Sequence, residues 1–110
     1  MAPISVWSPA PVPAGVRHAH HLFTLSIDPV VAGVDRDAFL NAMAAHNIGV
    51  GVHYLSVPEH TYYQQRFGWH PEQWPLAAKV GRQTVSLPLS AKLTEEDVDD
   101  VISAVRSILR

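Results

Sequence analysis

The clearest signal in this 110-residue sequence is a helix that begins near Thr94 and keeps one apolar face up to the C-terminus. Thr94 and Asp97 stand three positions apart, as in a capping box, where each side chain bonds to the backbone N–H of the other residue. Leu93 and Val98 occupy the positions of a hydrophobic staple across the same helix start. Apolar residues then recur at helical spacing, at Val98, Val101, Ile102, Val105, Ile108 and Leu109. Such a helix must bury its apolar face against a second layer, so the chain is predicted to fold as a layered domain.

Composition narrows the class of protein. Apolar residues make up 47% of the chain and charged residues 16%, which is typical of one globular domain and excludes a disordered or fibrous chain. The formal net charge of −2 and the lack of a Lys/Arg cluster argue against a nucleic-acid partner. Cysteine is absent, which excludes disulfides and thiolate metal sites and favours a reducing compartment such as the cytoplasm.

The N-terminal residues predict a linker rather than a targeting sequence. No positively charged segment precedes an apolar stretch, and no apolar run is long enough to span a membrane. Met1–Ile4 leads into a strip with Pro9, Pro11 and Pro13, a composition that disfavours helix and central strand. Residues 1–17 are therefore predicted to be a linker or the remnant of an interdomain segment, and residues 18–110 to be the domain.

Periodicity and turn residues predict the remaining elements. Strands are expected at residues 20–27, 48–55 and 84–87. Helices are expected from a cap at Asp35 to His46-Asn47, over residues 60–67, and from Pro75 to about Arg82. The expected fold class is α/β (α+β), with a small, mostly antiparallel or mixed sheet and helices packed on one face. The strand order stays open.

Seven histidines raise the question of a metal site. His18 and His20, with His21 beside them, would project from the same side of an extended chain closely enough to hold a metal ion weakly. No HExxH helix or further ligand pattern accompanies them. Hydrogen bonding at the start of a strand is therefore the favoured interpretation, and no metal site is predicted.

His53 and Tyr54 stand at the end of a glycine-spaced segment. The ends of strands often carry binding residues because a rigid element positions them there. Gly49 and Gly51 leave room for another backbone or a ligand to approach. From the residue pattern alone, a partly buried histidine bonded to a backbone carbonyl is nevertheless the favoured explanation of His53.

The residues contain no complete catalytic set. There is no cysteine nucleophile and no GxSxG elbow. Gly49 and Gly51 lack the rest of a phosphate-binding fingerprint. Asp97, Asp99 and Asp100 are explained as a cap and a solvated surface. Lys79 and Lys92 fall in an ordinary helix and in a turn, so neither is an obvious Schiff-base lysine.

Six short segments occur in an order and at a spacing that resemble one family. They are His-Ala-His-His-Leu-Phe (18–23), Asn-Ile-Gly-Val-Gly-Val-His-Tyr (47–54), His-Thr-Tyr-Tyr (60–63), Trp-Pro-Leu-Ala (74–77), Ser-Leu-Pro-Leu (86–89) and Leu-Thr-Glu-Glu-Asp-Val (93–98). Together they resemble the C-terminal part of the DegT/StrS-type aminotransferases, which aminate nucleotide-linked keto sugars. Within that family the chain is similar to the enzymes of the 4-amino-4-deoxy-arabinose type, chiefly through residues 53–63.

The resemblance implies a parent enzyme of the type I aminotransferase fold that depends on pyridoxal phosphate. Its large domain would carry the cofactor lysine, so no catalytic residue is expected in this chain and no cofactor is expected to bind to it alone. Glutamate would donate the amino group and a nucleotide-linked keto sugar would accept it. The parent would be a homodimer, and this chain by itself monomeric or weakly associated.

The same resemblance assigns one wall of the substrate cleft to this chain. His53 and Tyr54 would face the cofactor and the sugar, and His60 and Tyr63 would border the substrate entrance. Asn47 replaces the glycine usual at this helix end, and the loop at residues 55–59 leaves the sugar unidentified. Two alternatives stay open: a free-standing α/β module that binds or senses a small metabolite around His53, and a structural or dimerisation domain without a ligand.

Overall fold

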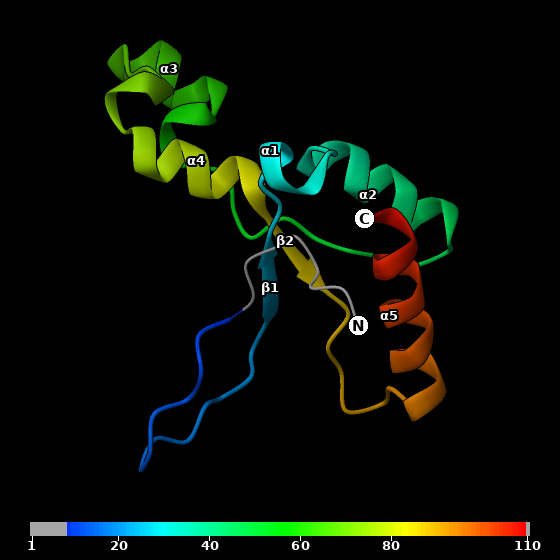
Figure 1. Cartoon of the computed structure of the whole chain (residues 1–110). Coiled ribbons are helices and arrows are strands. Elements are labelled where there is room, and N and C mark those ends of the chain that lie inside the picture. The colour runs from blue at the N-terminus through cyan, green and yellow to red at the C-terminus, as the bar shows by residue number, and fades with distance from the viewer. Residues whose placement is uncertain (1–8, 110) are drawn as a thin grey trace.

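The computed structural model describes residues 9–109, so Met1–Ile4 and the first part of the expected linker lie outside the described residues. The elements are β1 (Phe23–Ser26), α1 (Pro29–Ala32), α2 (Arg36–Ala45), η1 (Val57–Glu59), α3 (Thr61–Phe67), η2 (Pro71–Gln73), α4 (Pro75–Gln83), β2 (Thr84–Leu87) and α5 (Glu95–Ile108). Figure 1 shows the two strands at the centre, with α2 and α5 on one side and an arm made of α3 and α4 on the other.

The sheet consists of β1 and β2, which pair antiparallel with Phe23 opposite Leu87 and Ser26 opposite Thr84. Leu25 and Ile27 from the first strand region and Val85 from the second point into the core. There they meet residues of α2 and α5, namely Phe39, Met43, Ala104 and Val105. The predicted class, a small antiparallel sheet with helices packed on one face, is thus confirmed.

Helix α2 begins and ends where its sequence predicts. Asp35 caps the start, its Oδ1 accepting from the backbone N–H of Ala38 at 2.7 Å. Asn47 closes the helix in the left-handed region, with φ 59°. The next residue, Ile48, donates its N–H to the carbonyl of Met43 at 3.0 Å, the bond that terminates many helices. Ile48 also packs against the core.

Helix α5 has the predicted capping box. The N–H of Thr94 donates to Asp97 Oδ2 at 2.8 Å, and the N–H of Asp97 donates to Thr94 Oγ1 at 3.1 Å. The apolar face is covered only in its second half. Val105 is buried, whereas Val98 and Ile102 are exposed.

The predicted strand at residues 48–55 is wrong. Only Gly51 pairs with β2, forming an isolated antiparallel bridge with Ser86. Beyond it the chain leaves the strand edge and passes close to α4, where a Cβ on Gly81 would lie 2.7 Å from Ser56 N. The alternation of apolar residues is real, but the backbone after Gly51 packs under a helix instead of extending the sheet.

The start of the first strand also differs from the prediction. The strand begins at Phe23 rather than near residue 20, because His20 adopts a left-handed conformation with φ 48° that interrupts the extended chain. A one-turn helix, α1, follows where only a strand end was expected, capped by Asp28 Oδ1, which accepts from the N–H of Val30 at 3.0 Å.

A buried arginine joins helix α2 to the junction of α4 and β2. Arg36, at the start of α2, donates from Nη1 to the carbonyls of Gly81 and Thr84, both at 2.9 Å. These carbonyls lie at the junction of α4 and β2, so the guanidinium completes hydrogen bonds that the helix end leaves open. No helix within residues 9–109 is long and apolar enough to cross a membrane.

Candidate functional site

His53 lies beside the sheet edge that Gly51 forms with β2. Gly51 donates its N–H to the carbonyl of Ser86 at 3.1 Å and accepts from the N–H of Ser86 at 2.7 Å. Two residues later the side chain of His53 reaches back to the same serine, and His53 Nδ1 lies 2.8 Å from Ser86 Oγ, a hydrogen bond. The residue pattern alone favoured a hydrogen bond from His53 to a backbone carbonyl. The structure shows a bond to the side chain of Ser86 instead.

Gly51 allows this arrangement. A Cβ at this position would lie 2.9 Å from Cε1 of the His53 ring, closer than real Cβ contacts. The imidazole covers the glycine backbone, so the predicted close approach at Gly51 is made by a side chain of the same chain. Any larger residue here would push the ring away from Ser86.

The ring of His53 borders a cavity of about 250 Å³. Its lining comes from the segment before β1, from the glycine-spaced segment and from the end of β2: His21, Leu22, Gly49, Val50, Gly51, His53, Ser86, Leu87, Pro88 and Leu89. The side chains that offer hydrogen bonds are two imidazoles and one hydroxyl. Such a set binds and orients oxygen atoms of a ligand but contains no amine nucleophile.

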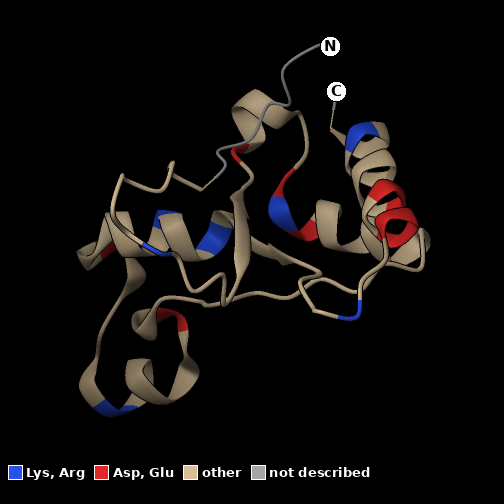
Figure 2. Ribbon diagram, turned by 90° about the horizontal axis from the view of Figure 1, so that it is seen from below, with Lys and Arg blue, Asp and Glu red and all other residues tan. Residues whose placement is uncertain are grey.

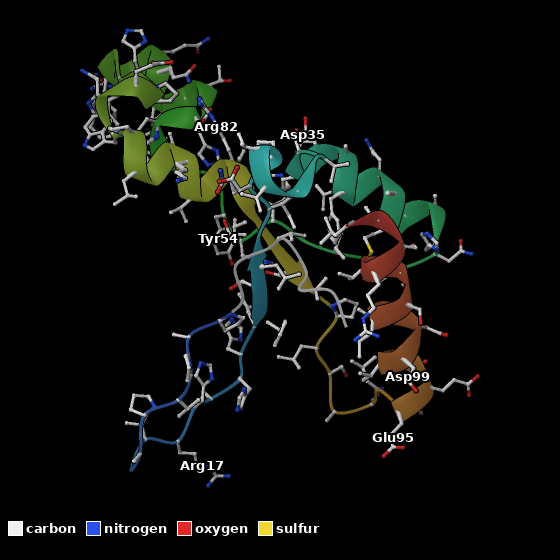
Figure 3. All side chains as sticks on the ribbon, in the orientation of Figure 1. Arg17, Asp35, Tyr54, Arg82, Glu95 and Asp99 are labelled. Atoms are coloured by element: carbon white, nitrogen blue, oxygen red, sulfur yellow. The ribbon has the colours of Figure 1, made fainter. Side chains whose placement is uncertain are left out.

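Tyr54 follows His53 after a cis peptide bond, and its ring meets the His53 ring edge to face with centroids 4.9 Å apart. The tyrosine is 73% exposed. Figure 3 shows it below α4, far from Glu95 and Asp99 of α5. It borders a second, mainly apolar cavity of about 640 Å³ along α4, shared with Trp74, Leu76 and Val80. His53 and Tyr54 thus form a pair that links the two cavities.

His60 and Tyr63 form a second pair, on the arm. His60 precedes α3 and its ring lies edge-on to that of Tyr63, with centroids 6.5 Å apart. Tyr63 stacks in turn on Phe67 and on Trp69, the latter at 6.0 Å with the rings 6° from parallel. Within residues 9–109 no ring contact joins this pair to His53 and Tyr54. The roles expected of these four residues stay predictions.

The histidines before β1 contact one another. The N–H of His20 donates to His18 Nδ1 at 2.7 Å, and the two rings lie 4.5 Å apart. This hydrogen bond is of the kind expected for the cluster. Across the described part of the chain, no group of three or more metal-ligating side chains was found. His21 instead lines the cavity at His53.

The other charged residues stand apart from this cavity. Lys79 and Lys92 are exposed and line neither of the two cavities described above. Figure 2 shows a group of acidic residues at the beginning of α5, with further acidic residues on other elements. There, the backbone N–H and the hydroxyl of Thr94 lower the pKa of Asp97 below its ordinary value of 3.8 by hydrogen bonding to its carboxylate.

Ser86 is a site residue that the sequence pattern did not indicate. It is 4% exposed and lies between Val85 and Leu87 in β2. The period of two in a strand places Ser86 on the face opposite Val85, away from the core. A single hydroxyl between apolar residues was the one feature of the sequence that could have indicated Ser86. Its partner, His53, stands 33 positions earlier in the chain, so no local pattern connects the two.

Comparison with known proteins decides the family. The profile of the DegT/DnrJ/EryC1/StrS aminotransferase family matches residues 2–106, nearly the whole chain. The chain belongs to this family. Among curated members, the spore coat polysaccharide biosynthesis protein SpsC of Bacillus subtilis is 43% identical over 95 residues. These residues are 86% of this chain and 24% of SpsC.

Solved structures of aminotransferases have the same fold. Spr1654 of Streptococcus pneumoniae, provisionally assigned as a sugar aminotransferase, superposes on 94% of this chain with a TM-score of 0.80 and 25% identity. It has been solved in apo, pyridoxamine phosphate and pyridoxal phosphate forms. PseC of Helicobacter pylori, an aminotransferase of pseudoaminic acid biosynthesis, superposes on 81% of the chain with a TM-score of 0.70 and 24% identity, which shows the fold alone.

The chain spans about a quarter of the length of these relatives. The described residues do not by themselves make a site for pyridoxal phosphate. That cofactor needs a lysine for its aldehyde carbon, and neither lysine of this chain lies at the cavity of His53. The side chains at the cavity of His53 supply hydrogen-bonding groups but no lysine amine.

Proposed function

We propose that residues 18–110 are the C-terminal small domain of a sugar aminotransferase that uses pyridoxal phosphate, with residues 1–17 as the linker to it. The parent enzyme would transfer an amino group from glutamate to a nucleotide-linked keto sugar, in the cytoplasm and as a homodimer. The family match over residues 2–106 carries this proposal. The cofactor, when bound by the rest of the enzyme, supplies the electron sink for amino transfer.

In this proposal His53 and Tyr54 face the bound substrate and cofactor. His53 Nδ1 is engaged by Ser86, while its Nε2 has no hydrogen-bond partner within residues 9–109. That nitrogen is free to bond to an oxygen of the sugar or of the cofactor. Tyr54, largely exposed beside the apolar cavity of α4, would cover the substrate from the adjoining side.

His60 and Tyr63 border the substrate entrance in the same proposal. They are held by the aromatic stacking of α3, in which Tyr63 lies against Phe67 and Trp69. Stacked rings hold one another at a defined distance, so this border would be stiffer than an ordinary surface loop. We expect the chain alone to be monomeric or weakly associated, and sedimentation showing a tight dimer would contradict that part.

The experiment that tests the function is an absorbance spectrum of the full-length protein with pyridoxal phosphate, before and after addition of glutamate. A visible cofactor band that glutamate removes is expected of an aminotransferase. If the correctly folded protein has no such band, a binding module around His53 becomes the better function.

The role of His53 has its own test in the same assay. His53→Ala is expected to slow at least one half-reaction more than about twofold, because a hydrogen bond made to the reacting complex is lost. His46→Ala serves as the control, since His46 is an exposed histidine at the end of α2 and does not line this cavity. Unchanged rates for His53→Ala would refute the role.

A further inference from the structure

The hydrogen bond between Ser86 and His53 determines which nitrogen of the neutral imidazole carries the proton. Ser86 is 4% exposed, so its hydroxyl hydrogen needs an acceptor within the protein. Its side chain has one hydrogen-bond partner among residues 9–109, His53 Nδ1 at 2.8 Å. If Nδ1–H donated to Ser86 instead, the buried hydroxyl hydrogen would have no acceptor. The bond is therefore satisfied when Ser86 donates to Nδ1.

This direction of the bond determines what His53 presents to a ligand. In a neutral imidazole one nitrogen accepts and the other carries the proton. With Nδ1 accepting from Ser86, the proton lies on Nε2. The cavity of about 250 Å³ then receives an N–H donor from His53, which suits an acceptor oxygen of a phosphate, carbonyl or hydroxyl group.

The support behind the ring is rigid. Ser86 lies in β2, and both its backbone hydrogen-bonding groups are tied to Gly51, at 2.7 and 3.1 Å. On the other side it pairs with Thr24 of β1. Gly51 itself leaves room for the ring, because a Cβ there would meet Cε1 at 2.9 Å. The hydroxyl and the bare glycine together hold the imidazole in one orientation.

We propose that Ser86 is a positioning residue, which holds His53 in the tautomer that carries its proton on Nε2 and aims that N–H at an acceptor oxygen of the ligand. This inference rests on the proposed function only in taking the ligand to be the substrate or cofactor of the aminotransferase. The geometry of the hydrogen bond is a property of this chain.

The tautomer is tested by nitrogen NMR of this chain, labelled with ¹⁵N-histidine, at a pH where the imidazole is neutral. The shifts expected are those of a protonated Nε2 and an unprotonated Nδ1. Ser86→Ala is expected to move both shifts toward the average of the two tautomers, and Ser86→Thr, which keeps a hydroxyl, to restore them. A protonated Nδ1 in the native chain, or unchanged shifts in Ser86→Ala, would overturn the proposal.

The control is Ser26→Ala. Ser26 is a serine of the same sheet whose hydroxyl donates to Gln83 Oε1 at 3.1 Å and has no contact with His53. It reports what removing any sheet hydroxyl does to folding, and it is expected to leave the His53 shifts unchanged. If Ser86→Ala failed to fold, Ser86→Thr and Ser86→Cys would provide the comparison, since the cysteine thiol is a much weaker donor.

The consequence for activity is tested in the full-length enzyme. Ser86→Ala is expected to lower kcat/KM about fivefold to tenfold, the size of one lost hydrogen bond. In a His53→Ala background the same substitution is expected to cost less than about twofold, because the ring it positions is gone. An equal cost in both backgrounds would mean a purely structural role and would overturn the inference. If His53→Ala itself had no effect, the proposed role of His53 would fail, while the NMR result would still decide the contact with Ser86.

Discussion

Asp97 shows how one side chain contributes to stability away from the candidate site. Its carboxylate accepts from the N–H of Thr94, while its own N–H donates to the threonine hydroxyl. The backbone N–H of Thr94, and after it the Thr94 hydroxyl, favour the ionised carboxylate by hydrogen bonding to it and so lower the pKa of Asp97. The group is fully exposed, so the effect is local to the first turn of α5. It nonetheless makes the start of this helix sensitive to pH.

The sign of this sensitivity can be predicted. A carboxyl whose pKa is lower in the folded than in the unfolded chain adds stability above its unfolded pKa, and this is lost as pH falls through the folded pKa. Asp97→Asn is therefore expected to lower the melting temperature at neutral pH and to match the native chain in strong acid. Thermal melts followed by circular dichroism measure this, with Asp99→Asn, outside the capping box, as the control. A constant difference at every pH would contradict the prediction.

Among the elements, the junction of α4 and β2 depends on α2. The helix α4 passes directly into β2, and Arg36 from α2 bonds to carbonyls on both sides of that passage. The guanidinium is buried, and its Nε also bonds to Asp37 at 2.8 Å. Ser86 therefore lies two residues after Thr84, whose carbonyl accepts a hydrogen bond from Arg36 of α2.

Arg36→Met tests the junction. The substitution keeps an unbranched side chain but leaves two carbonyls without their charged donor, which is expected to cost about 2–3 kcal/mol of unfolding free energy. Arg82→Met is the matched control. Arg82 pairs with Glu59 at 2.6 Å but is 56% exposed, so its loss is expected to cost less than about 1 kcal/mol. Urea denaturation measures both, and equal costs would show that Arg36 does not secure the junction.

The whole molecule is more open than its length requires. Its radius of gyration is 15.8 Å, whereas a compact domain of this size has about 13 Å. Its surface area is 8040 Å², against about 6000 Å² for a compact monomer of this mass. Large apolar side chains contribute to this surface, with Val30 91% and Leu76 75% exposed. A domain that normally packs against a larger one would have this shape.

The openness predicts that the isolated chain binds a hydrophobic dye while folded. The apolar cavity along α4, with Leu76 and Val80 on its rim, is the expected site. Replacing both residues with Gln is expected to reduce dye fluorescence at least about twofold, while Val30→Gln, exposed on α1 and outside both cavities, changes it little. Fluorescence titration under conditions of cooperative melting measures this. No dye binding to the native chain would contradict the prediction.

Local chemistry was enough to predict most of the elements. Asp35, Thr94 and Asn47 mark helix ends because each satisfies backbone groups within a few residues of itself. Pro75 starts α4 and Pro88 follows β2, because proline lacks the N–H that a helix interior or a strand ladder uses. His53 could be named as a candidate site residue for the same reason, because the glycines that indicate it, Gly49 and Gly51, lie within four residues of it.

Only the tertiary structure decided how that segment is used. The alternation of apolar residues over 48–55 indicates which side chains share a face. A strand also needs a neighbouring strand to pair with, and in this segment only Gly51 pairs with β2. The rest of the segment packs against Gly81 of α4, a contact that no local pattern records. In the same way, the bond from His53 to Ser86 spans 33 positions. The sequence by itself determined the local elements and the family, whereas the orientation of the His53 imidazole exists only because folding brings a buried hydroxyl to its Nδ1.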